Sequence, residues 1–229
     1  MSIEQFQNSI LLFDKPHGWT SFDVVNKVRR VLKAKIGHAG TLDPLATGLL
    51  ILCTGKETKN MISFQGLEKE YTGTMKLGAT TPSYDNETKV DHTFDIAHIT
   101  EETISSVIPH FIGTHDQFPP AHSAKHSEGK RYYEYARKGK EFEMKTHSVT
   151  LTEFEITRIE LPDVDFRIVC GKGYYVRSLV YDFGKALGAG AYLTKLCRTR
   201  IGPYQLKEAW QIKDFVNFVK PETELNAGS

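Results

Sequence analysis

Cysteine is scarce in this sequence, and the few cysteines present form no recognisable pattern. Cys53, Cys170 and Cys197 are far apart, with no CxxC pair and no zinc-finger spacing. Each lies in or beside an apolar run, which is typical of buried thiols in a reducing compartment. The spacing therefore gives no support to a disulfide scaffold or a zinc site, and we expect no bound metal.

Long apolar runs and several catalytic motifs are also missing. No run approaches the roughly 18 residues of a membrane-spanning helix, and residues 1–7 lack the basic and apolar regions of a signal peptide. We therefore expect a cytoplasmic protein with no membrane partner. HExxH, GxSxG and Walker A motifs are absent, which leaves metalloprotease, serine-hydrolase and nucleotide-hydrolysing chemistry without support.

The net charge is small, but the charges are unevenly distributed along the chain. Residues 24–42 contain five lysines and arginines and no acid, whereas residues 85–102 contain six acids and one lysine. This asymmetry suits oriented docking of a polyanion. Two solvated faces of opposite charge are the alternative explanation, and charge alone favours it.

The periodicity of the apolar residues indicates an α+β fold. It predicts helices at 21–33, 101–111 and 176–187, and strands at 10–13, 48–54, 70–77, 149–159, 165–170 and, more weakly, 202–210. Because strands outnumber helices and do not alternate with them regularly, we expect a mixed or antiparallel central sheet with flanking helices. We expect a single domain over residues 1–220 and a disordered tail at 221–229.

Residues 115–147 differ from the segments on either side. They contain two adjacent prolines, four histidines, seven lysines and arginines, and a cluster of tyrosines. Loops of this length in compact domains are usually functional or disordered. The segment is therefore predicted to be an insertion with a short helix inside it.

Asp43 is the most informative candidate for chemistry. It is the single carboxylate in residues 37–48, a stretch with glycine at positions 37, 40 and 48 and with Pro44 directly after the acid. Glycines permit close backbone approach, and a residue before proline is pushed into an extended or turn conformation. An Asp-Pro pair in such a loop is more often a turn former than a catalyst, so the loop alone does not decide between these roles.

Four other residues are candidates on their own chemistry. Arg177, just inside a predicted helix, could hold a carboxylate or could snorkel at the surface. Lys172, near the same helix start, could receive a phosphate, although the pattern is weak. Tyr71 could stack on a base or be a core aromatic. His38 could be a turn residue, wedge into a nucleic-acid stack or act as an acid–base group.

Several short motifs follow one another between residues 15 and 202. They are KPxGWTS at 15–21, GHAGTLDPLATG at 37–48, KxY at 69–71, TxSxD at 81–85, PP at 119–120, SAK at 123–125, YxxAR at 133–137, CxKGxYVRSL at 170–179 and LxRTRIG at 196–202. In this order they resemble the TruB family of tRNA pseudouridine synthases. The resemblance extends over most of the chain, and the long motif around Asp43 is its most specific part.

The resemblance implies a pseudouridine synthase fold and a specific reaction. Uridine at position 55 of tRNA, in the T arm, would be flipped out of the RNA and isomerised to pseudouridine without a cofactor. Asp43 matches the family's catalytic acid. Whether this carboxylate attacks the ring, attacks the sugar carbon or assists loss of the base through a glycal route stays open at this stage.

The resemblance also implies roles for other residues in binding the substrate. Arg177 would pair with Asp43 and keep it ionised, Tyr71 would stack on the uracil, and His38 would fill the space left by flipped bases. Leu196 would pack in the pocket, and Lys15 would support the Asp43 loop; we add Lys172 to this substrate-binding group. The residues expected to contact RNA are Lys27, Arg29, Arg30, Lys125, Lys130, Arg131, Arg137, Arg198 and Arg200.

The insertion at 115–147 matches in position the thumb that stand-alone members of the family fold over RNA. Many members continue into a C-terminal PUA domain, and we expect the present chain to be a short form without one. The expected partner is the T stem-loop of tRNA, bound by a monomer with no obligatory protein or guide-RNA partner. A guide-RNA-dependent enzyme in a larger particle and a non-catalytic RNA-binding protein on the same scaffold are the alternatives.

Overall fold

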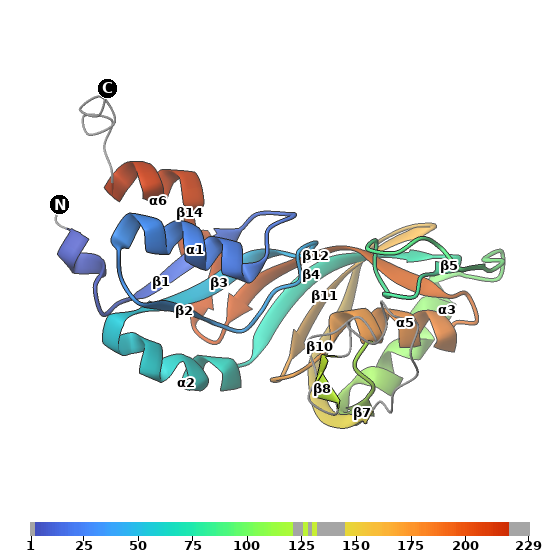
Figure 1. Ribbon diagram of the computed structural model, residues 1–229. Coiled ribbons are helices and arrows are strands. Elements are labelled where there is room, and N and C mark those ends of the chain that lie inside the picture. The colour runs from blue at the N-terminus through green and yellow to red at the C-terminus, as the bar shows by residue number, and fades with distance from the viewer. Residues whose placement is uncertain (1–2, 121–125, 128–129, 132–144, 220–229) are drawn as a thin grey trace. The chain divides into compact units, whose positions relative to one another are not determined.

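The computed structural model describes residues 3–120, 126–127, 130–131 and 145–219 (Figure 1). The chain divides into two compact units. Unit 1 contains residues 1–71 and 197–229, and unit 2 contains residues 72–196. Two strands, β4 (Lys69–Leu77) and β12 (Ala191–Ile201), contribute residues to both units.

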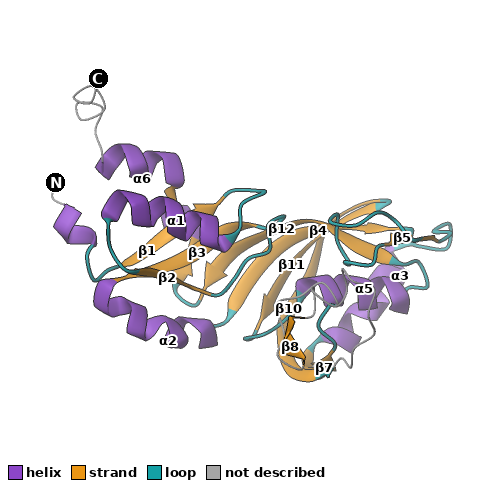
Figure 2. Cartoon of the chain, viewed as in Figure 1, coloured by secondary structure: helices purple, strands orange, loops and turns teal. Residues whose placement is uncertain are grey.

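Unit 1 is built on a mixed sheet flanked by helices (Figure 2). Its strand order is β14 (Trp210–Gln211), β1 (Ile10–Lys15), β3 (Thr47–Thr54) and the end of β12, with β2 (Ile36–Ala39) paired to β3 and β13 (Tyr204–Gln205) paired to β12. β1 and β3 are antiparallel, whereas β14 pairs in parallel with β1 and β12 in parallel with β3. The helices are α1 (Ser21–Leu32), α2 (Met61–Gly66) and α6 (Ile212–Val219), with 3-10 turns at Ile3–Phe6, Gly55–Asn60 and Leu206–Glu208.

The strand β3 is apolar from Leu49 to Cys53 because both of its faces are buried there. Leu50 and Leu52 pack in a cluster with the buried faces of α1 and α6, whereas Leu49 and Ile51 pack in a second cluster with Phe64 of α2. Successive side chains of a strand point to opposite faces, so a strand covered on both sides needs apolar residues at every position. Figure 1 shows α1 and α6 together on one side of the unit 1 strands.

The helix α1 is defined by its N-terminal cap and its apolar face. Thr20 and Asp23 form a capping box, in which the Thr20 hydroxyl accepts from the Asp23 amide at 3.1 Å and the Asp23 carboxylate accepts from the Thr20 amide at 2.8 Å. Val24, Val25 and Val28 are buried on its inner face. Burial stabilises the unit by roughly 1.5–3 kcal/mol for each such side chain, so α1 is held to the sheet mainly by this stripe.

Unit 2 contains a second set of paired strands. Their order is β12, β4, β11 (Asp163–Cys170), β10 (His147–Glu160) and β7 (Gly113–Gln117), with β10 antiparallel to both of its neighbours. β5 (Ala79–Thr80) pairs with β6 (His92–Thr93), and β8 (His126–Ser127) pairs with β9 (Lys130–Arg131). The described helices are α3 (Glu101–Val107), which a 3-10 turn at Ile108–Phe111 follows, and α5 (Val176–Ala186).

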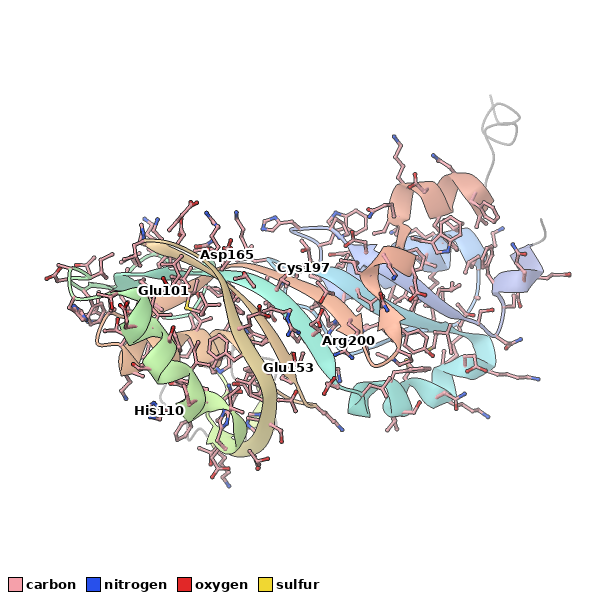
Figure 3. The ribbon with its side chains drawn as sticks, turned by 180° about the vertical axis from the view of Figure 1, so that it is seen from behind. Glu101, His110, Glu153, Asp165, Cys197 and Arg200 are labelled. Carbon is pink, nitrogen blue, oxygen red and sulfur yellow. The ribbon has the colours of Figure 1, made fainter. Side chains whose placement is uncertain are left out.

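One face of the unit 2 strands carries a helix and another carries charges. Phe183 of α5 packs edge-on against Phe154 of β10, with ring centroids 5.2 Å apart. The guanidinium of the exposed Arg158 donates to the partly buried Asp165 carboxylate at 2.7 Å, and the Thr74 hydroxyl donates to the same carboxylate at 2.6 Å. Figure 3 labels Asp165 on β11 and Glu153 on β10. An apolar inner face and a polar outer face are typical of antiparallel strands.

The predicted α+β class and mixed sheet with flanking helices are confirmed, but several elements differ from their predictions. The eleven-residue strand β12 was not predicted, and neither were the short helices α2 and α6. The predicted strand at 202–210 is two two-residue strands separated by a 3-10 turn. The single domain over 1–220 stays a prediction, and both the tail at 221–229 and most of the 115–147 insertion lie outside the described residues.

Candidate active site

Asp43 lies on a short loop between two paired strands of unit 1. The strands β2 and β3 are antiparallel, with His38 opposite Leu52 and Ala39 opposite Ile51, and they close the loop at its base. The Asp43 side chain is partly exposed, and its carbonyl accepts from the Ala46 amide at 3.1 Å. A carboxylate on a tight turn above a buried strand has few backbone conformations open to it.

Lys15, the last residue of β1, fixes this loop. Its side chain is fully buried, and the Nζ donates to the carbonyls of Trp19 at 2.5 Å, Pro16 at 3.1 Å and Pro44 at 3.3 Å. Burial lowers the pKa of Lys15 to about 8, and the negative charge of Asp43 opposes this shift. The amine therefore joins the turn at 16–19 to the residue that follows Asp43, which is the supporting role that the resemblance implies.

Arg198 holds the loop from the opposite side. Its side chain is 1% exposed; its Nε donates to the Leu49 carbonyl at 2.8 Å, and an Nη donates to the Gly40 carbonyl at 3.2 Å. The guanidinium thus bridges the two ends of the Asp43 loop. This corrects the assignment of Arg198 as an RNA contact, because a buried guanidinium engaged by carbonyls is not available to a phosphate at the surface.

Ser21 gives the loop a third anchor. The Leu42 amide donates to the Ser21 hydroxyl at 2.9 Å, and the hydroxyl donates back to the Leu42 carbonyl at 3.2 Å. Ser21 is buried at the first position of α1. The residues on both sides of Asp43 are therefore tied to rigid elements, and neither Ser21 nor Arg198 was given this role by sequence reasoning.

His38 lies on β2 and is partly buried. Its Nδ1 is buried without a hydrogen-bond partner among the described residues. Burial lowers the pKa of His38, and the positive charge of Arg198 lowers it further. The imidazole is therefore neutral at neutral pH. A neutral ring is better suited to packing or stacking than to carrying charge.

Arg177 lies in the first turn of α5 in unit 2 and points inward. It is 4% exposed, its Nε is 3.6 Å from the Asp85 carboxylate, and its Nη1 donates to the Ser83 carbonyl at 3.1 Å. Asp85 also accepts from the Ser83 hydroxyl at 2.6 Å and from the Glu87 amide at 2.9 Å. Within unit 2, the carboxylate that Arg177 holds is thus Asp85, which the sequence showed as part of TxSxD without a role.

The remaining substrate-binding candidates are distributed over both units. Tyr71 is buried on β4 at the end of unit 1, and Leu196 is partly buried on the part of β12 that belongs to unit 2. Lys172 is exposed in the turn between β11 and α5. The pairing of Asp43 with Arg177 joins residues of different units and stays a prediction.

The candidate RNA contacts have different surroundings. Lys27, Arg29 and Arg30 are exposed on α1, although Arg29 also donates to the Ile36 carbonyl at 3.1 Å. Arg200, labelled with Cys197 on β12 in Figure 3, lies 2.9 Å from a Glu68 oxygen and 3.9 Å from a Glu70 oxygen. Its charge is therefore compensated locally. Lys125 and Arg137 lie outside the described residues. Lys130 and Arg131 form β9, of which only the backbone is described.

In the described part of the chain, histidines, cysteines and acids form no group of three or more that could hold a metal ion. None of the helices there combines the length and apolar character that crossing a membrane requires.

Solved structures with the same fold include chains from two multi-component complexes. A chain from a Cbf5–Nop10–Gar1 complex matches with a TM-score of 0.76 and 30% identity, and a chain from an H/ACA RNP bound to a substrate RNA containing 2′-deoxyuridine matches with 0.74 and 27%. Both alignments cover 99% of the present chain but 59% and 58% of those chains, so it spans under three fifths of their length. Fold and motifs together define the class as an RNA uridine isomerase.

The family is settled by sequence. Residues 29–176 match the N-terminal domain model of the TruB family of pseudouridylate synthases, and residues 177–227 match the C-terminal domain model of tRNA pseudouridylate synthase B. The chain belongs to the TruB family. This confirms the family, the fold and the enzyme class that the motifs predicted.

Bacterial relatives cover almost the whole chain. The tRNA pseudouridine synthase B of Flavobacterium johnsoniae is 53% identical over 220 residues, with 93% of this chain and 96% of the relative covered. The tRNA pseudouridine synthase B of Parabacteroides distasonis is 50% identical over 227 residues, with 94% and 97% covered.

Proposed function

We propose that the chain isomerises uridine to pseudouridine at position 55 in the T arm of tRNA, with Asp43 as the catalytic residue. In this reaction the N1–C1′ bond breaks, a C5–C1′ bond forms, N1 gains a proton and C5 loses one. The products balance without a cofactor or a redox partner. The observation that carries the proposal is the anchoring of the Asp43 loop. Three buried residues hold this loop at three points: Lys15, Ser21 and Arg198.

Such anchoring matters because catalysis by a single carboxylate depends on its position. A misplacement of about 1 Å can reduce a rate by two orders of magnitude. A loop that served only as a turn would need none of these anchors, and burying a lysine and an arginine to hold it carries a desolvation cost. The arrangement supports a catalyst better than it supports a turn former.

The other residues of the site would act on the flipped nucleotide. Arg177, already oriented by Asp85, would pair with Asp43 and keep it ionised. Tyr71 would stack on the uracil and Leu196 would pack beside it. Neutral His38 would fill the space that the extruded base leaves in the RNA stack, where replacement contacts offset an unstacking cost of a few kcal/mol.

We also propose that the enzyme acts alone on tRNA, as a cytoplasmic monomer without a guide RNA. The support is the pattern of the relatives: proteins named tRNA pseudouridine synthase B match along nearly their full length, whereas the chains of the guide-type complexes extend well beyond the match. A guide-RNA-dependent enzyme is the second candidate, favoured by the fold match to those complexes.

One experiment separates these functions. The purified chain is incubated with an unmodified tRNA transcript, and pseudouridine is mapped by position. We expect product at position 55 from the wild type, none from Asp43→Asn, and full activity from the control Glu101→Gln, whose exposed carboxylate lies on α3 in unit 2.

The outcomes bear on different parts of the proposal. Activity of the Asn variant equal to that of the wild type would remove Asp43 from the mechanism. No product from wild type, with product restored by added guide RNA or protein, would favour the guided enzyme. Binding of tRNA without product under any condition would favour a non-catalytic RNA-binding protein.

A further inference from the structure

A groove in unit 1 takes no part in the proposed chemistry. Its volume is about 580 Å³, within the range of small-ligand pockets. It lies where the end of β1, the turn at 16–19 and α1 meet β14 and α6. The helices α1 and α6 lie side by side in Figure 1. The side chains that decide its chemistry are Asp14, Trp19, Lys27, Gln211, Ile212 and Lys213.

The groove has a flat apolar wall. The Trp19 ring is partly exposed, and it packs against the same core cluster as Ile212 and Val216. Its position is therefore fixed by the core of unit 1. An indole face held in this way is a platform on which a planar nucleic-acid base can stack.

A hydrogen-bonding edge adjoins this wall. Gln211 donates from Nε2 to the Asp14 carboxylate at 2.8 Å. The structure gives Asp14 no other hydrogen bond or ion pair to a described residue, so its remaining lone pairs can accept from a ligand. Carboxylates accept from the exocyclic amino groups of bases, and the Gln211 carbonyl adds a second acceptor.

Two lysines complete the lining. Lys27 comes from α1 and Lys213 from α6, both are exposed, and neither forms an ion pair with a described residue. Phosphates are the groups that such lysines bind in nucleic acids. A flat apolar wall, acceptors for an amino group and two cations match the planar base, the exocyclic amino group and the flanking phosphates of a nucleotide within a chain.

The turn that carries Trp19 is also joined to the Asp43 loop by hydrogen bonds. The Gly18 amide donates to the Pro44 carbonyl at 2.8 Å, and Lys15 donates to the carbonyl of Trp19 itself. The turn that supplies the indole therefore also fixes the residue after Asp43. An RNA that reaches Asp43 comes within a few residues of Trp19.

We infer that this groove binds one unpaired nucleotide of the RNA substrate. Its base stacks on Trp19 with its amino group toward Asp14, and its flanking phosphates lie near Lys27 and Lys213. The inference rests on the proposed function for the identity of the RNA. A docked acidic peptide is a poorer match, because it would bring carboxylates toward Asp14.

Tryptophan fluorescence reports directly on binding in the groove, because Trp19 and Trp210 are the two tryptophans of the chain. In the variant Trp210→Phe, the tryptophan fluorescence arises from Trp19, and the new Phe keeps the aromatic contact with Phe215. Titration with an unmodified tRNA transcript is expected to quench this emission at least twofold. The converse variant Trp19→Phe is expected to show less quenching and weaker RNA binding.

The lysines are tested by their salt dependence. Lys27→Ala/Lys213→Ala is expected to weaken tRNA binding about tenfold and to reduce the slope of log K against log salt by about 1.4–1.8. The matched control Lys56→Ala/Lys59→Ala removes two exposed lysines from the 3-10 turn at Gly55–Asn60 of the same unit. It should stay within about twofold of the wild type.

Several results would overturn the inference. One is an equal loss of tRNA affinity in the two double variants. Another is unquenched Trp19 fluorescence in a preparation that forms pseudouridine. A third is quenching by free cytidine monophosphate at the same affinity as by tRNA. If the wild type forms no pseudouridine but tRNA still quenches Trp19, the reaction proposal fails and the groove inference stands.

Discussion

The Nε of Arg177 lies 3.6 Å from the Oδ2 of Asp85, and both side chains are more than nine-tenths buried. The Ser83 hydroxyl and the Glu87 amide hold Asp85, while the Ser83 carbonyl holds Arg177. A single turn of unit 2 therefore neutralises and orients the Arg177 guanidinium.

Replacing Asp85 by Asn should damage both stability and rate. The change leaves a buried guanidinium without its counter-ion, and breaking a buried pair in this way typically costs about 3–5 kcal/mol. We expect the free energy of unfolding to fall by about 3 kcal/mol, and kcat to fall at least about tenfold with less change in KM. Urea denaturation and initial rates measure the two effects. A variant that loses stability but keeps kcat would show that Asp85 serves folding alone.

Lys15 should make stability depend on pH in the alkaline range. Its pKa is about 8 in the folded chain and 10.5 in its ordinary state, so between these values the unfolded chain binds more protons. Its contribution to the free energy of unfolding therefore rises with pH across this window. The difference between wild type and Lys15→Met, measured by urea denaturation at pH 7, 9 and 10, should rise by on the order of 1 kcal/mol. A flat difference would contradict a buried, charged amine.

The sequence predicted the parts of the fold whose burial is simple. β3 is apolar on both faces, and α1 has a capping box and a clean apolar stripe, so both were found within one residue of their bounds. β12 was missed because Lys195, Arg198 and Arg200 interrupt its pattern. The Arg198 side chain points inward, and carbonyls far away in the sequence accept hydrogen bonds from its guanidinium. The residues around Arg198 in the sequence do not reveal such partners.

In the candidate site too, residues with a local sequence signal were easier to predict than residues that act through tertiary contacts. The loop composition singled out Asp43 as a candidate, and its catalytic role stays a prediction. For Arg177 the sequence left two possibilities open, holding a carboxylate or snorkelling at the surface, and the structure has its guanidinium beside Asp85. The anchors of the loop were harder to find because they are ordinary residues on other elements. Ser21 looked like part of a helix start, and Arg198 looked like one cation in a basic motif. Only tertiary contacts distinguish them from surface groups.

Gly48 should be intolerant of any side chain. Its φ is +101°, and a Cβ there would lie 2.4 Å from the Arg198 carbonyl and 2.7 Å from its amide. Because both neighbours are backbone atoms of β12, they cannot move aside cheaply. Gly48→Ala is expected to lower the free energy of unfolding by about 2 kcal/mol or more.

Gly66 provides the matched control for this change. It is exposed at the end of α2, and a Cβ would meet nothing within 4 Å. Gly66→Ala should be neutral or stabilise the chain by up to about 1 kcal/mol. Thermal and urea denaturation of the two variants give the comparison, and an equal loss in both would show that strand approach at Gly48 is not the cause.

Arg198→Lys tests whether this residue positions Asp43 or binds RNA. Lysine keeps the charge but cannot bridge the carbonyls of Gly40 and Leu49 with a planar fork, so the Asp43 loop should lose its second clamp. An unsatisfied buried carbonyl costs about 1–3 kcal/mol, and a looser loop should lower kcat about tenfold or more. Because the guanidinium is buried, tRNA affinity and its salt dependence should stay within about twofold of wild type. Single-turnover rates and binding titrations at two salt concentrations make the distinction: a selective loss of rate identifies a positioning residue, whereas weakened binding with a shallower salt dependence would restore Arg198 to the RNA contacts.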